Sequence, residues 1–364
     1  MTDMNLLFQT TFLRPFLHIL KILTYGFSIV CLSLLLLNLL SNQVLAKPTV
    51  NQLTSSSVLS YEDKSTLIQQ TFEVMQAHYI APSKVKSTYD IISEKHTRNA
   101  YKHVTSLAEF AEHIGRDIRD ITQDLHLSIM LQQPDKPLTH ILKPKPGKLK
   151  YNYAFEQAKY LSGNIAYLKF NKFDPAPEAK STADSAMLFL QYADAMVIDL
   201  RDTVGGSPDL VEYLLSYFIE AETPLWSIQW RTEQMAKENS PLFESEQIET
   251  SSTPKHANFR QDFPVWILTS KTSASATELF AGVLKAQNKA TVVGETTAGA
   301  GYYVGVRPIT EHLTFRISLA KPIIAVSNKN WERIGITPDV ETHRVDALDR
   351  ALMLAKQAHP QSVN

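Results

Sequence analysis

Hydrophobic residues recur along the chain with two different periods, and their order predicts an α/β core. The run 264–270 is apolar and β-branched, which is typical of a buried strand. Apolar positions at helical spacing follow over 276–284, and 291–295 is another strand-like run. Similar patterns predict strands at 164–170, 195–200, 224–231, 302–306 and 313–319 and helices at 178–192, 209–219 and 346–356. Strands that alternate with helices favour an α/β fold with a mixed or largely parallel sheet.

The segment before this core has helical periodicity instead. Apolar positions predict helices over 57–76, 85–95 and 107–125, and Thr105 or Ser106 is the expected cap of the last one. A short strand at 128–131 and a proline-rich loop follow. We therefore expect a small helical domain over residues 47–130 and an α/β domain over residues 131–364.

The first 46 residues have the pattern of an export signal. Arg14 and Lys21 precede an apolar run at 22–40, and Val44 and Ala46 fit the small-residue rule for signal cleavage. The run is nearly long enough to span a bilayer, so an uncleaved anchor is the alternative to a signal peptide. In either case the expected location is periplasmic or extracellular, and an uncleaved segment would add membrane association.

Composition narrows the possible partners. The chain has 36 Lys and Arg residues against 37 Asp and Glu residues, and this balance argues against nucleic acid. Its one cysteine, Cys31, lies in the apolar N-terminal run, which leaves no disulfide framework and no cysteine metal site. The histidines are scattered without ligand spacing, so we expect no metal and no cofactor. The residues carry no prediction of oligomeric state.

A cluster of hydroxyls lies at the junction between the strand 264–270 and the helix after it. Residues 271–275 read Lys-Thr-Ser-Ala-Ser. The first turn of a helix has unpaired N–H groups and a partial positive charge, so a hydroxyl there can act as a nucleophile whose oxyanion is stabilised. The alternative is a structural N-cap, which the residues by themselves favour.

Two further features have both a chemical and a structural interpretation. Gly205 and Gly206 follow the strand 195–200, where a backbone with positive φ can approach an anion, or can simply form a tight turn into the next helix. His126 ends the helix predicted at 107–125. A histidine there is either a dipole-interacting residue or a catalytic one, and it needs a partner before it counts as catalytic.

Three stretches in order resemble the C-terminal processing (tail-specific) peptidase family. They are 195–210 (AMVIDLRDTVGGSPDL), 272–301 with its Ser-Ala-Ser-Ala-Thr-Glu, and 330–348 with its Gly-Ile-Thr-Pro-Asp. The helical region, ending in Asp-Leu-His-Leu at 124–127, is similar to the branch that includes the modules of interphotoreceptor retinoid-binding protein (IRBP). The resemblance runs from about Tyr61 to the C-terminus. It implies a ClpP/crotonase-like α/β core of mixed or parallel sheet flanked by helices.

The resemblance also implies roles for individual residues. The family nucleophile corresponds to Ser275. The lysine base of the tail-specific proteases is missing, because residues 299–301 read Gly-Ala-Gly. Relatives similar to the tricorn core protease use a histidine and a glutamate instead, which here are His126 and Glu332. Such a base and its orienting carboxylate would activate the serine. The implied oxyanion hole consists of N–H groups from Gly205 or Gly206 and from Ala276.

The chain departs from the family in two further ways. Thr203 replaces an asparagine before the glycine pair, and no stretch between His126 and Tyr151 is long enough for a PDZ domain.

From the export pattern and the family resemblance, we expect an exported serine peptidase that cleaves peptides or unfolded segments through an acyl-enzyme. The alternatives are an esterase with the same residues and a non-catalytic module that binds an apolar ligand or a peptide, since fold does not settle function. The chain lacks the Gly-x-Ser-x-Gly of α/β-hydrolases.

Overall fold

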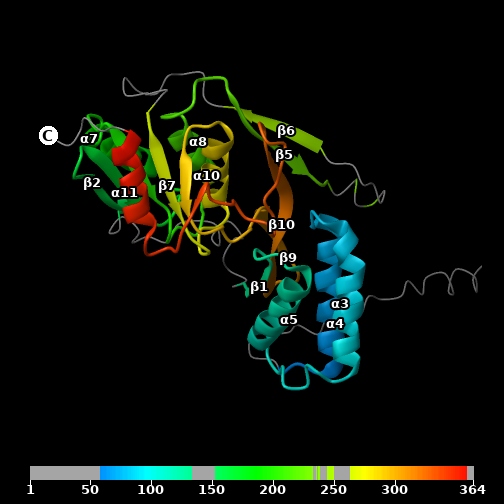
Figure 1. Ribbon diagram of the computed structural model, residues 1–364. Coiled ribbons are helices and arrows are strands. Elements are labelled where there is room, and N and C mark those ends of the chain that lie inside the picture. Colours follow the sequence, from blue (N-terminus) through cyan, green and yellow to red (C-terminus); the bar gives the residue numbers. More distant parts are fainter. Residues whose placement is uncertain are drawn as a thin grey trace, which may run out of the picture. The chain divides into compact units, whose positions relative to one another are not determined.

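A computed structural model describes residues 58–132, 152–232, 244–249 and 263–358, together with residues 235 and 237 (Figure 1). The chain divides into two compact units, Met1–Gln52 and Leu53–Asn364, and every described residue belongs to the second. The predicted export segment therefore lies outside the described residues. Among the helices that are described, none has the length and hydropathy needed to cross a membrane.

A six-stranded sheet forms the centre of the α/β region. Its strand order is β11-β8-β7-β4-β3-β2, and all neighbours are parallel except β2 and β3, which are antiparallel. The predicted mixed or largely parallel sheet is confirmed. The strands are β2 (Phe155–Leu161), β3 (Ile165–Phe170), β4 (Ala195–Asp199), β7 (Val265–Thr269), β8 (Thr291–Gly294) and β11 (Val340–Glu341).

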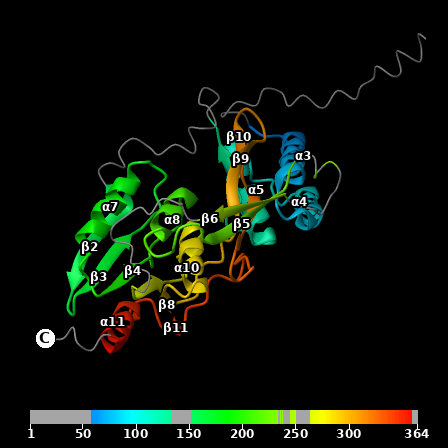
Figure 2. The same cartoon turned by 90° about the horizontal axis from the view of Figure 1, so that it is seen from above.

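Helices cover both faces of this sheet because its central strands are apolar on both faces (Figure 2). Leu168 and Ile267 point to one face, against α7 (Ala179–Phe189), α8 (Pro208–Leu215) and α10 (Ala276–Ala286). Tyr167 and Leu268 point to the other, against α11 (Ala347–Ala358). Continuous apolar runs are what a strand buried on both faces requires.

A second, antiparallel sheet packs beside the first, and the sequence pattern did not separate the two. Its order is β1-β10-β5-β6, with β9 also paired to β10. The strands are β1 (Ser128–Leu131), β5 (Pro224–Trp230), β6 (Glu244–Glu249), β9 (Tyr303–Pro308) and β10 (Leu313–Ile324). The polar excursion at 232–262 contributes β6, which forms a hairpin partner of β5; most of the rest lies outside the described residues.

The N-terminal region is helical, as predicted. It contains α3 (Tyr61–His78), the 3₁₀ turn η1 (Pro82–Lys84), α4 (Val85–Thr97) and α5 (Leu107–Thr122). Ser106 caps α5, and Glu109 completes a capping box. Helix α5 ends three residues before the predicted Leu125, because Gln123 adopts a left-handed conformation with φ of 55°.

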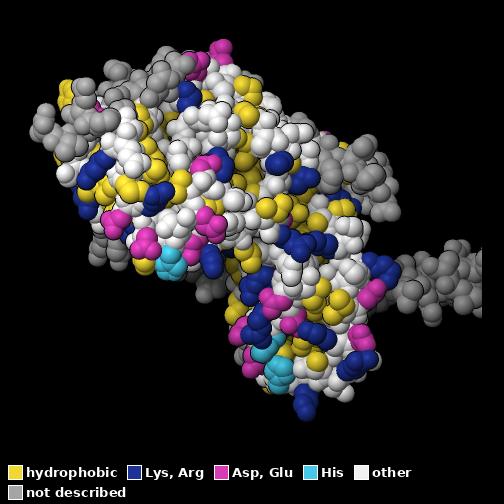
Figure 3. All heavy atoms as spheres, in the orientation of Figure 1, with side chains coloured by type: hydrophobic (Ala, Val, Ile, Leu, Met, Phe, Trp, Pro, Cys, Tyr) yellow, Lys and Arg dark blue, Asp and Glu magenta, His cyan; other side chains and the backbone are white. Residues whose placement is uncertain are grey.

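The helical region is joined to the second sheet by hydrogen bonds. β1 crosses the boundary that we predicted at residue 130, and it pairs with β10 in the register Ser128 to Arg316. The amide of Ile80 donates to the carbonyl of Ser318, also on β10. These contacts fix the end of α5 against the α/β region. On the face shown in Figure 3, basic and acidic side chains are interspersed with apolar ones.

Candidate active site

Three loops emerge at one edge of the six-stranded sheet, where the neighbouring strands β4, β7 and β8 end. Strand β4 leads into residues 200–206, β7 into 270–275 and β8 into 295–302. In open α/β sheets, ligands bind outside the carboxyl ends of the strands. The strand order therefore brings the glycine pair and Ser275 to the same edge.

Ser275 begins α10 in a backbone conformation that serine rarely adopts. Its φ is 60° and its ψ is −120°. Backbone conformations of this kind cost about 1–3 kcal/mol and cluster at active sites. The hydroxyl makes no capping hydrogen bond to α10 and lies instead 3.2 Å from Nε2 of His126. Ser275 thus occupies the N-cap position while its side chain faces a histidine.

The other hydroxyls in this turn bind backbone. Ser270 and Thr272 both donate to the carbonyl of Arg201, at 2.6 and 2.7 Å. Ser273 donates to the carbonyl of Leu200 at 2.8 Å. These bonds tie the turn after β7 to the end of β4. Of the hydroxyl cluster predicted at 271–275, Thr272 and Ser273 therefore have a structural role.

Glu278 is a fully buried carboxylate that the sequence interpretation assigned no role. It accepts the N–H of Ser275 at 2.8 Å, the hydroxyl of Thr297 at 2.6 Å, and the amides of Gly299 and Ala300 at 2.7 and 2.8 Å. Burial raises the pKa of Glu278, whereas these four donors favour its charged form. Its spacing of three residues after Ser275 is the signal that identifies it as a reciprocal cap.

The glycine pair lies directly against Ser275. Gly205 has φ of 97°, and a Cβ on it would lie 2.8 Å from Cβ of Ser275. Its N–H donates to the hydroxyl of Thr277 at 3.1 Å. Gly206, with φ of 141°, is exposed, and among the described residues no hydrogen bond is recorded for its amide or for that of Ala276. The amide of Ala276, directly after the serine, and that of Gly206, directly after Gly205, are therefore donors without a recorded partner in this part of the described chain.

Thr203, the departure from the family pattern, supports the glycine loop. It is fully buried, and its hydroxyl donates to the carbonyl of Phe170 at 2.6 Å. Its carbonyl accepts the amide of Ala274 at 3.2 Å and the hydroxyl of Thr277 at 3.0 Å. The threonine therefore links the end of β3, the glycine loop and the turn before Ser275.

Helix α5 ends at Thr122, so His126 lies beyond the helix, where its side chain reaches Ser275. The turn after Gln123 and the pairing of β1 with β10 hold His126 between the helical region and the sheet edge. Its side chain is buried, and Nδ1 has no hydrogen-bond partner among the described residues. Burial, together with the positive charge of Arg316, lowers the pKa of His126 to about 4. The imidazole is therefore neutral near pH 7.

Glu332 lies in the loop that the sequence predicted, but no hydrogen bond to His126 is recorded among the described residues. Its Oε2 accepts the amide of Gly301 at 2.7 Å, and its Oε1 is buried without a partner in the same part of the chain. Burial, together with the negative charge of Asp124, raises the pKa of Glu332 to about 8.

Asp124 is a second carboxylate near His126. It is fully buried, its Oδ1 accepts the amide of His126 at 3.0 Å, and the same oxygen lies 3.8 Å from Nδ1 of that ring. The sequence interpretation gave Asp124 no role. The signal that identifies it is the Asp-x-His spacing, since a short acidic side chain readily accepts the amide two residues ahead.

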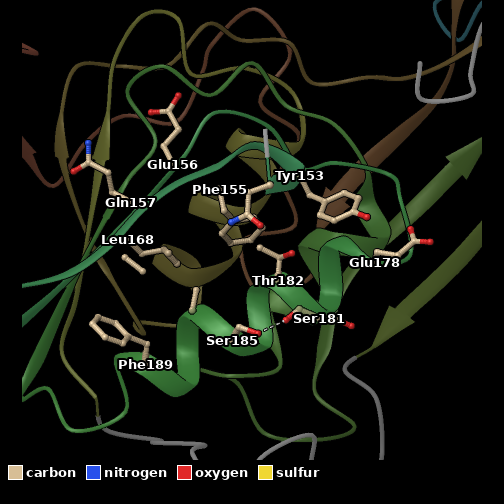
Figure 4. A pocket seen from close by; sticks show the side chains of 13 residues that line it. Tyr153, Phe155, Glu156, Gln157, Leu168, Glu178, Ser181, Thr182, Ser185 and Phe189 are labelled. Carbon is tan, nitrogen blue, oxygen red and sulfur yellow. Dashed lines mark hydrogen bonds between the residues drawn. The ribbon is translucent and has the colours of Figure 1, made fainter. Parts of the chain in front are cut away.

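A separate pocket lies between β2, β3 and α7 (Figure 4). Tyr153 and Glu178 line one part of it and Phe189 another, with Thr182 and Ser185 along α7. None of the predicted site residues lines this pocket. Packing of aromatic side chains, Phe155 on Phe170 and Phe170 on Phe173, lies between this pocket and the glycine loop.

Comparison with known proteins identifies the same two regions. The model of peptidase family S41 matches residues 164–342, and the model of the N-terminal domain of S41 peptidase in eukaryotic IRBP matches residues 55–158. The carboxy-terminal processing protease CtpB of Bacillus subtilis (strain 168) is 26% identical over 222 residues, which is 60% of this chain and 43% of CtpB. The chain thus spans less than half the length of that relative.

Solved structures agree on the fold. A protein from Parabacteroides merdae ATCC 43184 superimposes with a TM-score of 0.57 at 18% identity, over 81% of this chain and 96% of its own. The tricorn protease superimposes with a TM-score of 0.50 at 10% identity, over 82% of this chain and 37% of its own. The resemblance in the three sequence stretches and in the helical region is confirmed: the chain belongs to peptidase family S41 and carries the N-terminal domain of the IRBP type.

Proposed function

We propose that this chain is a serine peptidase in which Ser275 is the nucleophile and His126 the general base. The observation that carries the proposal is the 3.2 Å separation of Ser275 Oγ and His126 Nε2. A serine hydroxyl is a weak nucleophile until a positioned base takes its proton. A neutral imidazole within hydrogen-bond reach is such a base.

The proposed reaction forms and then hydrolyses an acyl-enzyme. His126 accepts the proton of Ser275 as Oγ attacks the scissile carbonyl, and it returns that proton to the leaving amine. We assign the oxyanion hole to the amides of Ala276 and Gly206, while Gly205 permits the close approach of the loop. A water molecule then attacks the acyl-enzyme, with His126 again as the base.

We propose that the carboxylate of Glu332 supports this site. Its contribution to the rate is smaller than that of Ser275 or His126. Its bond to Gly301 holds the loop that Glu278 fixes at Gly299 and Ala300. The lysine of the tail-specific proteases has its counterpart in this loop, where the chain has Ala300 instead. The base must therefore come from outside the loop, and His126 is in that position.

The substrate we propose is a peptide or an unfolded segment of a protein. Leu125 and Val204 are exposed apolar residues next in sequence to His126 and Gly205, and exposed Ile334 lies two residues after Glu332. Exposed apolar side chains can mark interaction sites, and on this basis we propose that the substrate contributes apolar groups. A purely binding module gives no reason for a buried imidazole beside the serine. Incubation with an unfolded protein and identification of the new termini tests the activity; intact substrate with folded protein would contradict it.

We also propose that the chain is exported, from the pattern of residues 1–46. Fractionation of expressing cells with N-terminal sequencing tests this. A mature form beginning at Lys47 outside the cytoplasm is the expected result, and a full-length form retained inside the cell is the opposite one.

The acid limb in the pH profile of kcat/KM is expected to lie at an unusually low pH. Only neutral His126 can act as base, so the rate is full above its pKa and is lost as the pH falls through about 4. Initial rates on an activated ester measure this limb, with circular dichroism at each pH to exclude unfolding. A midpoint near the ordinary histidine value of about 6.5 would show that burial does not control this residue.

Replacement of Gly205 by alanine is expected to lower kcat by about 10²-fold or more, because the added Cβ pushes the loop away from Ser275 and disturbs the oxyanion hole. Positive φ at an alanine also costs about 1–3 kcal/mol of stability. Gly163, with φ of 87° in the turn between β2 and β3, is the matched control. Gly163→Ala should lose the stability that a positive φ costs and keep its kcat; equal kcat losses would contradict the assignment.

A further inference from the structure

The second ring nitrogen of His126, Nδ1, needs a hydrogen-bond acceptor. When Nε2 accepts the proton of Ser275, the neutral ring carries its own proton on Nδ1. That N–H is buried, and no hydrogen-bond partner is recorded for it among the described residues. Buried donors are almost always satisfied. An acceptor must therefore be close to Nδ1.

Asp124 provides the carboxylate oxygen recorded beside this nitrogen. Its Oδ1 lies 3.8 Å from Nδ1, whereas no hydrogen bond or ion pair between Glu332 and His126 is recorded within the described part of the chain. The amide of His126 donates a hydrogen bond to the same oxygen, and this bond holds the Asp124 carboxylate in place. A shift of about 1 Å closes the distance, and catalytic hydrogen bonds commonly tighten only when substrate is bound.

The surroundings of Asp124 form a concentration of unsatisfied polar atoms. Five of the ten buried polar side-chain atoms without a partner in the described chain belong to this cluster: Tyr79 OH, Asp124 Oδ2, His126 Nδ1, Ser318 Oγ and Glu332 Oε1. The charged and titratable groups around Asp124, besides His126, come from the helical region, the loop before β9, β10 and the loop after β10, and they are Tyr79, Lys84, Tyr302, Arg316 and Glu332. Unsatisfied buried groups of this density mark strained or catalytic sites.

We propose that Asp124 is the positioning residue for His126, a role that rests on the proposed function. Its carboxylate accepts Nδ1–H, holds Nε2 toward Ser275, and stabilises the imidazolium formed when Ser275 loses its proton. Glu332 then acts on the loop through Gly301 and not on the ring. Burial raises the pKa of Asp124, while the amide of His126 and the charge of Lys84 favour its charged form.

Kinetics of four full-length proteins distinguish this role from a structural one. Asp124→Asn is expected to lower kcat on an activated ester by about 10²–10⁴-fold with little change in KM, because the amide stabilises the wrong tautomer. Glu332→Gln is expected to lose less than about tenfold at pH 7. Asp117→Asn is the matched control, since Asp117 lies on α5 and binds Tyr101 and Lys95 instead; its kcat should equal that of the wild type.

The imidazole tautomer gives a readout that does not depend on activity. In ¹H–¹⁵N spectra, with the His126 signals identified by difference from His126→Gln, the wild type should carry its proton on Nδ1, and Asp124→Asn should move it to Nε2. A wild-type ring protonated on Nε2 overturns the proposal even if the variant fails to fold. So does a folded Asp124→Asn protein with wild-type tautomer and kcat. An inactive wild type overturns the proposed function, while the tautomer still decides the role of Asp124.

Discussion

Replacing Ser275 by alanine is expected to lower the rate of hydrolysis by about 10⁴–10⁶-fold, since the acyl-enzyme can no longer form. The stability of the fold should change little, because the Ser275 hydroxyl does not cap α10. The residual rate then reflects binding and oxyanion stabilisation alone. Rates on an activated ester and on an unfolded protein measure the loss.

Ser106 is the matched control for this substitution. It also precedes a helix, but its hydroxyl does accept the amide of Glu109, at 3.3 Å. Ser106→Ala should therefore cost about 1 kcal/mol of stability and leave the hydrolytic rate unchanged. The two serines are expected to give opposite results. A Ser275→Ala protein that loses stability but keeps its rate would show that Ser275 is a cap and not the nucleophile.

Replacing His126 by alanine is expected to produce a loss nearly as large, of about 10⁴-fold or more, because the proton of Ser275 then has no acceptor in reach. The effects should not add. The double variant of His126 and Ser275 should be no slower than Ser275→Ala, since the two residues act as one unit. Kinetics of the single and double variants on the same ester measure this.

A second serine–histidine pair in the described chain provides the control. Nε2 of His96 lies 2.8 Å from the hydroxyl of Ser65, and His96 is buried between Tyr61 and Tyr101. It has no strained serine and no glycine loop beside it. His96→Ala should therefore lower stability and leave the rate unchanged. If His96→Ala and His126→Ala impaired hydrolysis equally, the loss would be one of folding.

The elements of the six-stranded sheet could be predicted because their apolar patterns are strong. The strand at 264–270 and the helix at 276–284 were located almost to the residue. The edge strand β2 was missed because it alternates irregularly and is largely exposed. Its stabilisation comes from pairing with β3, and pairing between distant segments leaves little trace in a local pattern.

The antiparallel sheet illustrates the same limit. Its strands β5, β9 and β10 were predicted, but their assignment to a separate sheet depends on the pairing of β10 with β5 and β1, which are far away in sequence. The pairing of β1 with β10 joins residues about half the chain length apart, and it is this pairing that positions His126. Local propensity contains no information about such contacts.

The site residues also differ in how far the sequence predicts them. Ser275 and the glycine pair lie on adjacent strand ends, so the α/β pattern alone brings them to one edge. The roles of Glu278, Thr203 and Asp124 depend on buried hydrogen bonds that only the folded chain reveals. The placement of the proposed nucleophile beside the glycine loop could therefore be predicted from sequence more securely than the groups that contact it.

Reaction of the full chain with a fluorophosphonate probe tests the central assignment most directly, because an activated serine attacks the phosphorus of such a probe, displaces fluoride and becomes phosphonylated. We expect the wild type to be labelled, with mass spectrometry placing the adduct on Ser275, and neither Ser275→Ala nor His126→Ala to be labelled. A folded wild-type protein that stays unlabelled, or an adduct on another serine, would contradict the assignment of Ser275 and His126 as nucleophile and base.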